Sequence, residues 1–197
     1  MKIDFTRKEF FWKYYDSCLQ NFNDYKSCGW IDSQSQTLRY SAMFETGIIQ
    51  SNSTILDWGC GDGNLIEFLQ NINFNFKNYT GYDINPKMID FALNKFPDNN
   101  FTSKLNRSKT DWVVASGIFS IDISEDEMKS EIQSMWKHSK IGVAFNLISD
   151  GWSGAGRNLC TWNKSQVLEW VSSNFPKIKV VQGYLGDEDF TVFLLRQ

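Results

Sequence analysis

The sequence predicts an α/β fold, a three-layer sandwich in which helices cover both faces of a mostly parallel sheet whose last strand is antiparallel. Three observations predict it. Short apolar runs alternate with helical patterns, a glycine-rich turn links the first run of this series to a helix, and the short link GDED joins the last two runs. A chain of 197 residues has the usual size of one domain, so we expect a single domain over residues 1–197.

The N-terminal part of the chain, residues 1–51, is expected to form a helical cap. Residues 7–22 carry aromatic and apolar side chains at steps of three and four, which predicts a helix with one apolar stripe. A polar loop follows, and a second helix is expected from about Ser35 to Ile49. The aromatic side chains of the first helix are expected to face a core or to cover a site.

Residues 52–197 are expected to form the core of the fold, with strands and helices in alternation. The apolar runs that predict strands are 53–58, 79–84, 100–103, 112–119, 141–148, 177–185 and 190–196. The periodic segments that predict helices are 64–72, 86–96, 125–138 and 164–173. In a parallel sheet of this kind, ligands bind at the carboxyl ends of the strands, so the loops that follow the strands hold the candidate residues.

The composition disfavours several classes of partner. The net charge is -3, the pI is near 5.2, and no run of basic residues is available to neutralise a nucleic-acid backbone. No apolar run approaches the roughly 20 residues that cross a bilayer, so no membrane partner is expected. The four cysteines lie far apart without CxxC spacing, which predicts no metal site and a reducing, cytoplasmic location.

The stretch ILDWGCGDGN, Ile55–Asn64, contains three alternate glycines between a strand and a helix. A phosphate-cradling loop would need a lysine after the last glycine, and none is present. A dinucleotide fingerprint would need GxGxxG, but the third glycine here, Gly63, comes one position too early. The spacing is DxGxGxG, and an acidic residue near the loop would repel a diphosphate.

This loop and its context resemble the class I S-adenosylmethionine-dependent methyltransferases, over residues 54–195. The resemblance implies a Rossmann-like fold with a seven-stranded sheet and S-adenosyl-L-methionine as the cofactor. It implies that the methionine part is held by Asp57, Gly59, Cys60 and Gly61. It also implies that Asp83 takes the ribose hydroxyls, Ile84 and Met88 pack on the adenine, and Ser116 and Gly117 line the cofactor site. The final strand FTVFLL is a further mark of the family.

One part of the sequence departs from the family. Many members carry an acidic residue after the third strand that receives the adenine amino group, whereas the segment FTSKLNRSKTD here is short and basic. Ser103 or a backbone group is therefore expected to take that role.

Residues outside the motif provide further candidates. In the cap, Trp30 is expected to stack on the cofactor and Arg39 to pair with its carboxylate. Asp122, Asn146 and Asp150 follow strands at the ligand side and are weak candidates for a proton acceptor, although ordinary loop polarity explains them equally well. The loop DGWSGAGRN, with Arg157, is a lid or a plain connection. The single histidine, His138, is expected to be structural, at the opposite edge of the sheet.

The function predicted from these residues is methyl transfer to a small-molecule acceptor by in-line displacement. The fourth-strand motif reads SGIF rather than the Pro-Pro-aromatic tetrad of nucleic-acid adenine methyltransferases. Two alternatives remain open: a non-catalytic S-adenosylmethionine-binding protein, and a nicotinamide-dependent oxidoreductase. The sequence does not choose among oxygen, nitrogen and carbon acceptors.

Overall fold

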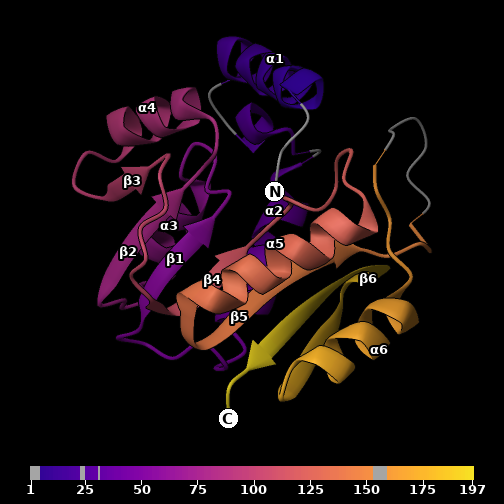
Figure 1. Cartoon of the computed structure of the whole chain (residues 1–197). Helices are drawn as coiled ribbons and strands as arrows, with labels where there is room; N and C mark the ends of the chain where they lie inside the picture. Colours follow the sequence, from indigo (N-terminus) through magenta and orange to yellow (C-terminus); the bar gives the residue numbers. More distant parts are fainter. Residues whose placement is uncertain (1–4, 23–24, 31, 153–158) are drawn as a thin grey trace.

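Figure 1 shows the computed structural model of the chain, which describes residues 5–22, 25–30, 32–152 and 159–197. The helices are α1 (Phe5–Asn21), the 3₁₀ helix η1 (Tyr25–Cys28), α2 (Ser33–Phe44), α3 (Asn64–Asn71), α4 (Pro86–Lys95), α5 (Glu125–His138) and α6 (Lys164–Asn174). The strands are β1 (Thr54–Trp58), β2 (Asn78–Tyr82), β3 (Asn100–Thr102), β4 (Thr110–Ala115), β5 (Ser139–Ile148) and β6 (Lys177–Leu195). None of the described helices is long and apolar enough to cross a bilayer.

The strands form one sheet in the order β3-β2-β1-β4-β5-β6. All neighbours pair in parallel except β5 and β6, which are antiparallel over residues 142–148 and 189–195. The direction in which successive strands are added reverses at β1, because β2 lies on one side of β1 and β4 on the other. Such a reversal opens a crevice at the carboxyl ends of the strands, where open parallel sheets bind ligands.

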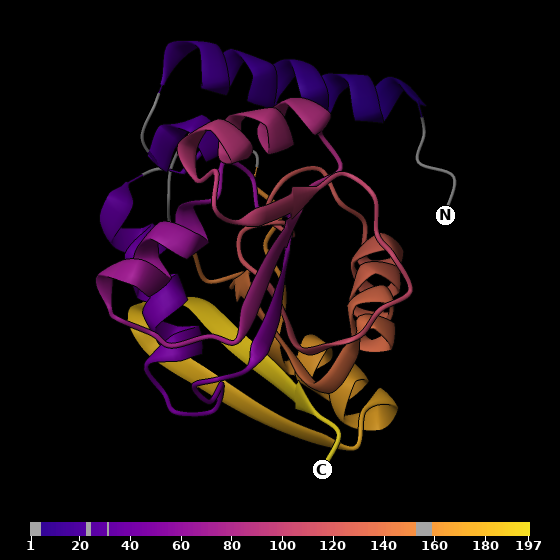
Figure 2. The same ribbon diagram turned by 90° about the vertical axis from the view of Figure 1, so that its left-hand side faces the viewer.

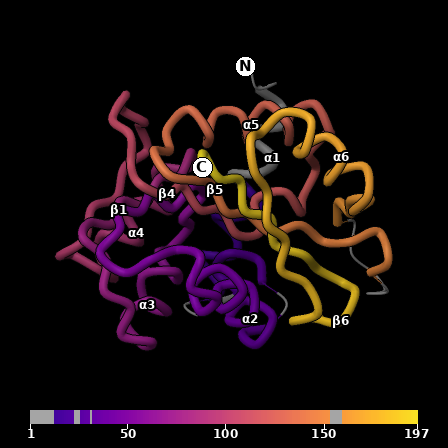
Figure 3. Tube along the Cα trace, turned by 90° about the horizontal axis from the view of Figure 1, so that it is seen from below, coloured from indigo at the N-terminus to yellow at the C-terminus, as the bar shows by residue number. Residues whose placement is uncertain are grey.

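The two C-terminal apolar runs form one continuous element, β6, rather than two separate strands. Figure 3 shows the chain doubling back within this element. Gly183 and Gly186, in the middle of its sequence, both adopt positive φ angles that favour glycine. Each half of β6 corresponds to one of the runs that the sequence predicts. The mostly parallel seven-stranded arrangement with an antiparallel end is therefore confirmed.

Helices cover both faces of the sheet, so the molecule has three layers. On one face, α2 and α3 pack through Met43, Phe44 and Leu69 against strand residues that include Ile55. On the other face, α5 and α6 pack onto a second apolar cluster, through buried residues such as Ile132 and Val171. Alternate residues of the strands feed the two clusters, as the period of two in a β-strand requires.

Side chains and prolines at the helix starts stabilise the ends of α4 and α5. Asn85 caps α4 by accepting a hydrogen bond from the Lys87 amide at 3.0 Å, and Pro86 occupies the first helical turn. Ser124 and Glu127 form a capping box at the start of α5. These caps fix the points where the chain leaves the ligand edge of the sheet.

The predicted N-terminal cap divides into two parts. Figures 1 and 2 both show α1 beyond the carboxyl ends of the strands and next to α4, where Asp16 of α1 forms an ion pair with Lys87. In contrast, α2 belongs to the layer on the sheet face, since Met43 and Phe44 are buried there. Within the described part of the cap, α1 and η1 therefore lie over the strand ends, whereas α2 packs on the sheet face and reaches the cavity through Arg39 and Tyr40.

Candidate functional site

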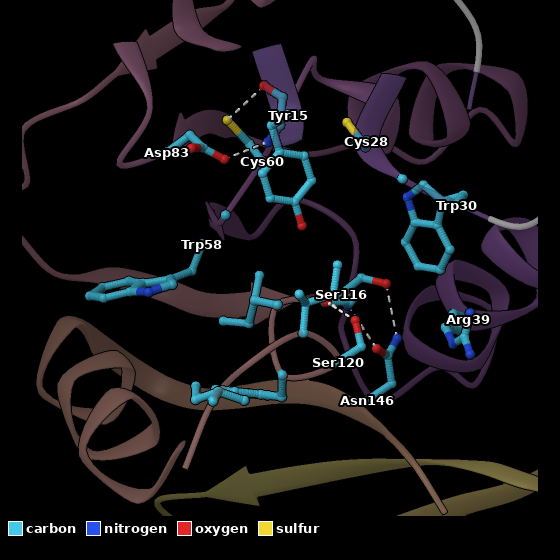
Figure 4. A pocket seen from close by; sticks show the side chains of 18 of the residues that line it. Tyr15, Cys28, Trp30, Arg39, Trp58, Cys60, Asp83, Ser116, Ser120 and Asn146 are labelled. Atoms are coloured by element: carbon cyan, nitrogen blue, oxygen red, sulfur yellow. Dashed lines mark hydrogen bonds between the residues drawn. The ribbon is translucent and has the colours of Figure 1, made fainter. Parts of the chain in front are cut away.

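A cavity of about 370 Å³ lies at the carboxyl ends of β1, β2, β4 and β5. Its walls come from the loops that follow these strands, and α1 and η1 contribute Tyr15 and Cys28. Figure 4 shows Trp30 and Arg39 on one side of this pocket, Trp58 on the other, and Tyr15 projecting between them. The cavity therefore occupies the crevice that the strand order creates.

The glycine loop approaches its neighbours too closely for side chains. A Cβ atom on Gly59 would lie 2.3 Å from the Ile118 side chain, and one on Gly61 would lie 2.4 Å from the Cys28 sulfur. Both glycines have positive φ angles. The loop is held to β2 because the Gly59 and Cys60 amides donate to the Tyr82 carbonyl at 2.7 and 3.0 Å. The glycines, with Cys60, therefore form a bare, fixed surface on the cavity wall.

Asp57 lies behind this loop and is not among the residues that line the cavity. Its side chain is 4% exposed, and its Oδ2 atom accepts a hydrogen bond from the Tyr79 hydroxyl at 2.7 Å. Burial raises its pKa to about 7, against the opposing effect of the Tyr79 hydrogen bond. The strand turns this side chain toward the sheet interior, which the spacing of the motif does not reveal.

Asp83, directly after β2, lines the cavity. Its two carboxylate oxygens accept the Gly61 amide at 3.0 Å and the Asn85 amide at 2.8 Å. Burial raises the pKa of Asp83, while these two hydrogen bonds oppose the shift. The neighbouring Ile84 and Met88 also line the cavity. Asp83 thus links the glycine loop to the start of α4 and still faces the ligand space.

Ser116 and Gly117, after β4, line the cavity together with Asn146 of β5. The Asn146 amide bridges the two loops, donating to Ser116 Oγ at 3.0 Å and accepting from the Gly117 amide at 3.1 Å. Gly117 has a positive φ angle, and a Cβ atom there would lie 3.2 Å from the Trp30 indole. Asn146 is therefore a positioning residue that shapes the floor of the cavity.

Arg39 and Trp30 both line the cavity, but Arg39 already has an anionic partner. Its Nε and Nη2 atoms lie 2.7 and 2.6 Å from Asp189 Oδ2, and its guanidinium lies 5.1 Å from the Trp30 ring. Asp189 is buried and also accepts a hydrogen bond from Tyr184. Nε and Nη2 are therefore engaged with Asp189, and Nη1 has no partner among the described residues. If Arg39 binds the cofactor carboxylate as expected, its guanidinium must contact that carboxylate and Asp189 at the same time.

The remaining candidates differ in their positions. Asp122 lines the cavity, is exposed, and adopts a φ angle of 40°. Asp150 does not line the cavity, and its Oδ2 atom accepts a hydrogen bond from Asn163 at 2.8 Å. Of the predicted lid, Gly154, Gly156 and Arg157 lie outside the described residues.

His138 does not line the cavity. It lies at the end of α5, and its Nδ1 atom is 2.9 Å from the Ser134 carbonyl. Its ring packs against the indole of Trp58, with 5.4 Å between ring centres, and Trp58 does line the cavity. The histidine therefore supports the wall from behind, consistent with a structural role.

Sequence reasoning missed several residues that help to form the cavity. Tyr15 belongs to the aromatic stripe of α1, yet it lines the cavity and its hydroxyl points inward (Figure 4). Asp62 is fully buried behind the loop, where its carboxylate accepts hydrogen bonds from Ser27 Oγ at 2.7 Å and Cys28 Sγ at 3.1 Å. Glu131 of α5 also lines the cavity. The sequence around each of these residues predicts a helix or a turn, but contains no signal that the side chain lies at or near a cavity.

Comparison with known proteins agrees with this geometry. Residues 56–142 match a family model described as a methyltransferase domain, and this segment contains the glycine loop, Asp83 and the β4 motif. Over these 87 of its 197 residues, the chain is similar to methyltransferase domains. The match confirms the predicted enzyme class and its cofactor, S-adenosylmethionine. None of the curated proteins matches the chain.

Solved structures share the fold of this methyltransferase domain at low sequence identity. Magnesium protoporphyrin IX methyltransferase from Synechocystis PCC 6803 has a TM-score of 0.68 and 14% identity, over 96% of this chain and 100% of that chain. The N-methyltransferase NodS from Bradyrhizobium japonicum WM9 has a TM-score of 0.65 and 16% identity, over 93% and 97%. A TehB-like methyltransferase from Corynebacterium glutamicum has a TM-score of 0.60 and 16% identity, over 98% and 100%.

Proposed function

We propose that this domain transfers a methyl group from S-adenosylmethionine to a small-molecule acceptor. The observation that carries the proposal is the cavity of about 370 Å³ at the strand ends, because α1 and η1 contribute to its wall from above. Pockets for small molecules are concave, of this order of size, and lined by aromatic side chains with a few polar groups. Trp30, Tyr15 and Trp58 supply such aromatic surfaces here.

The residues of the cavity fit the cofactor. Asp83 offers its carboxylate oxygens to the ribose hydroxyls, and the bare glycine surface admits the methionine part. Asn64 and Asn85 both line the cavity, and their buried Nδ2 atoms have no hydrogen-bond partner among the described residues. A buried donor without a partner is costly, so a bound oxygen-rich ligand would stabilise both side chains.

The charge of the cavity also supports a small acceptor. Arg39 is the only cationic residue among the described side chains that line it, and Asp189 neutralises that charge. The acidic groups that line it include Asp83, Asp122 and Glu131. Such a wall suits a sulfonium ligand, whereas a polyphosphate backbone would be repelled. A neutral or cationic small molecule is therefore the expected acceptor.

S-adenosylmethionine supplies a methyl group that is already activated by its sulfonium. The chain has to align the acceptor and exclude water, and such positioning is worth roughly 7 to 11 kcal/mol. Tyr15 and Trp30 restrict access from above, while Asn146 holds the β4 and β5 loops in place. Burial raises the pKa of Tyr15, so its hydroxyl stays protonated and acts as a hydrogen-bonding group rather than as a base.

The test is transfer of a labelled methyl group from S-adenosylmethionine to a fractionated metabolite extract. Label is expected in the low-molecular-weight fraction and should be absent from added RNA, DNA and protein. An Asp83→Asn variant should transfer at least tenfold less label at limiting cofactor, because a neutral amide is a poorer acceptor for two hydroxyl groups. Label in a macromolecule alone would contradict the proposed acceptor class, and no transfer at all despite cofactor binding would indicate a binding protein.

A further inference from the structure

Beyond Asp83, one side of the cavity is a mostly apolar slot, formed by Trp58, Tyr82, Ile118, Ile123 and Glu131. The Trp58 and Tyr82 rings meet edge to face, with 5.1 Å between their centres and 66° between their planes. The slot thus has two aromatic walls and aliphatic edges. Its one ionisable carboxylate belongs to Glu131, which comes from α5.

This slot borders the start of the glycine loop, because Ile118 lies against Gly59 and the Tyr82 carbonyl accepts the Gly59 and Cys60 amides. Tyr82 also directly precedes Asp83 in the chain. The Tyr82 hydroxyl is close enough to both Glu131 and Asp83 for each carboxylate to raise its pKa, after the larger effect of burial. Figure 4 shows Trp58 opposite Trp30 and Arg39, with the pocket between them. A cofactor with its ribose at Asp83 and its methionine part along the glycine loop would extend its planar base past Asp83 into this slot.

The segment after β3 does not supply the contact that the sequence led us to expect. Neither Ser103 nor any other residue from 103 to 109 lines the cavity. This stretch connects β3 directly to β4 without a helix. The polar recognition of the base must therefore come from another element.

We propose that Glu131 accepts a hydrogen bond from the 6-amino group of the cofactor's adenine, with Trp58 and Tyr82 packing on the ring. The proposal rests on the proposed function only for the placement of the ribose at Asp83. Glu131 then determines which base the site accepts. The acceptor for the adenine amino group therefore lies on α5 rather than in the segment after β3.

The chemistry of Glu131 suits this role. Its carboxylate is half-buried, and burial raises its pKa, while a hydrogen bond from Trp58 opposes that shift. A carboxylate has about four acceptor positions, so the bond from Trp58 leaves room for an amino donor. A base with a carbonyl oxygen at the same position would place two acceptors against each other, and a site built for a donor rejects such an analogue strongly.

The experiment compares two ligands by isothermal titration calorimetry. One is S-adenosylhomocysteine, and the other is its deaminated analogue, S-inosylhomocysteine, in which oxygen replaces the 6-amino group. The unmodified protein is expected to bind the first at least tenfold more tightly, as for loss of a hydrogen bond to a charged group. Glu131→Gln should reduce that preference to threefold or less, because an amide can also donate to the oxygen.

The matched control is Glu125→Gln, which removes an exposed acid from the same helix; Glu125 forms an ion pair with Lys129 and does not line the cavity. It should keep the preference of the unmodified protein. Glu131→Ala, which removes the acceptor altogether, should also lose the preference. The preference is the ratio of two affinities measured on the same variant, so a smaller folded fraction affects both affinities equally and leaves the ratio unchanged. A Glu131→Gln protein that keeps the full preference overturns the assignment. Failure of the unmodified protein to bind S-adenosylhomocysteine would instead overturn the proposed function.

Discussion

At the scale of single residues, the acids of this site have separate tasks that their chemistry alone does not distinguish. Asp57, Asp62 and Asp83 all lie in or near the glycine loop, but only Asp83 reaches the cavity wall. Asp57 is tied to Tyr79 behind the loop, and Asp62 is tied to Ser27 and Cys28 of η1. The direction in which each side chain leaves the backbone decides its contact: Asp83 faces the cavity, Asp57 contacts a strand of the sheet, and Asp62 contacts the N-terminal cap.

Asp57 should make folding stability depend on pH in an unusual direction. The pKa of an Asp in an unfolded chain is about 3.9, and burial raises that of Asp57 to about 7 in the folded protein. The folded state therefore binds the proton more tightly, and the stability that this provides is fully present below about pH 4. It is lost as the pH rises through about 7, by an amount on the order of a few kcal/mol.

Urea unfolding of the native protein and of Asp57→Asn at pH 5 and pH 8 measures this effect. The asparagine variant keeps an acceptor for the Tyr79 hydroxyl but cannot ionise, so it should lose less stability between the two pH values. Equal losses in both proteins would show that Asp57 does not titrate in this range.

Tyr15 is expected to contribute to turnover more than to cofactor binding. Its hydroxyl points into the cavity and makes no hydrogen bond with the described residues, so it is available to a bound molecule. Tyr15→Phe should lower the rate of label transfer about tenfold while the affinity for S-adenosylhomocysteine changes by less than a factor of two. Tyr14→Phe, which alters the adjacent residue outside the cavity wall, is the control. Equal losses in the two variants would contradict the assignment.

At the scale of elements, η1 is fastened to the glycine loop by a buried network. Ser27 Oγ and Cys28 Sγ donate to the Asp62 carboxylate, the Asp62 amide lies 3.4 Å from the same sulfur, and Lys95 Nζ lies 3.8 Å from Asp62 Oδ2. This network holds η1, which covers part of the cavity, against the glycine loop. The position of η1 and the conformation of the glycine loop are therefore coupled.

Ser27→Ala should loosen this coupling. The variant leaves the buried Asp62 carboxylate without one of its donors, which costs about 1 to 3 kcal/mol. Hydrogen exchange should rise across η1 and the start of α3, with weaker cofactor binding. Ser173→Ala, on the exposed side of α6, is the control and should leave both measurements unchanged. Unchanged exchange in η1 would contradict a fastening role for Ser27.

Much of the element layout could be predicted from the sequence, because its signals are local. Asn85 with Pro86, the Ser124 capping box and the buried run of β5 each mark a boundary within a few residues. The site could be predicted only in part. The Arg39–Asp189 pair joins positions 150 residues apart. Glu131 lies on a helix whose acids look like an ordinary solvated face, so no local pattern indicates its position on the cavity wall.

At the scale of the whole molecule, the ion pair between Arg39 and Asp189 joins α2 to β6 beside the cavity. The Asp189 side chain is fully buried and also accepts a hydrogen bond from Tyr184. Removing one member of a buried pair leaves an uncompensated charge, which typically costs 3 to 5 kcal/mol. The pair therefore holds together two layers of the fold and one wall of the site.

Asp189→Ala should lower the free energy of unfolding by about 3 kcal/mol. The control is Asp187→Ala, which changes an exposed aspartate in the same strand and should cost less than about 0.5 kcal/mol. Urea titration at pH 7 gives both values. Similar values for the two variants would show that the Arg39 charge finds another partner.

The same ion pair sets an order of events during synthesis. The ribosome synthesises α2 long before β6. Arg39 therefore has no Asp189 carboxylate to pair with until 150 further residues have been added. Until β6 has emerged and paired with β5, that side of the cavity lacks the charge balance that the finished protein has. Competence to bind the cofactor is therefore expected to appear late, after release of the last strand, rather than when the glycine loop first folds.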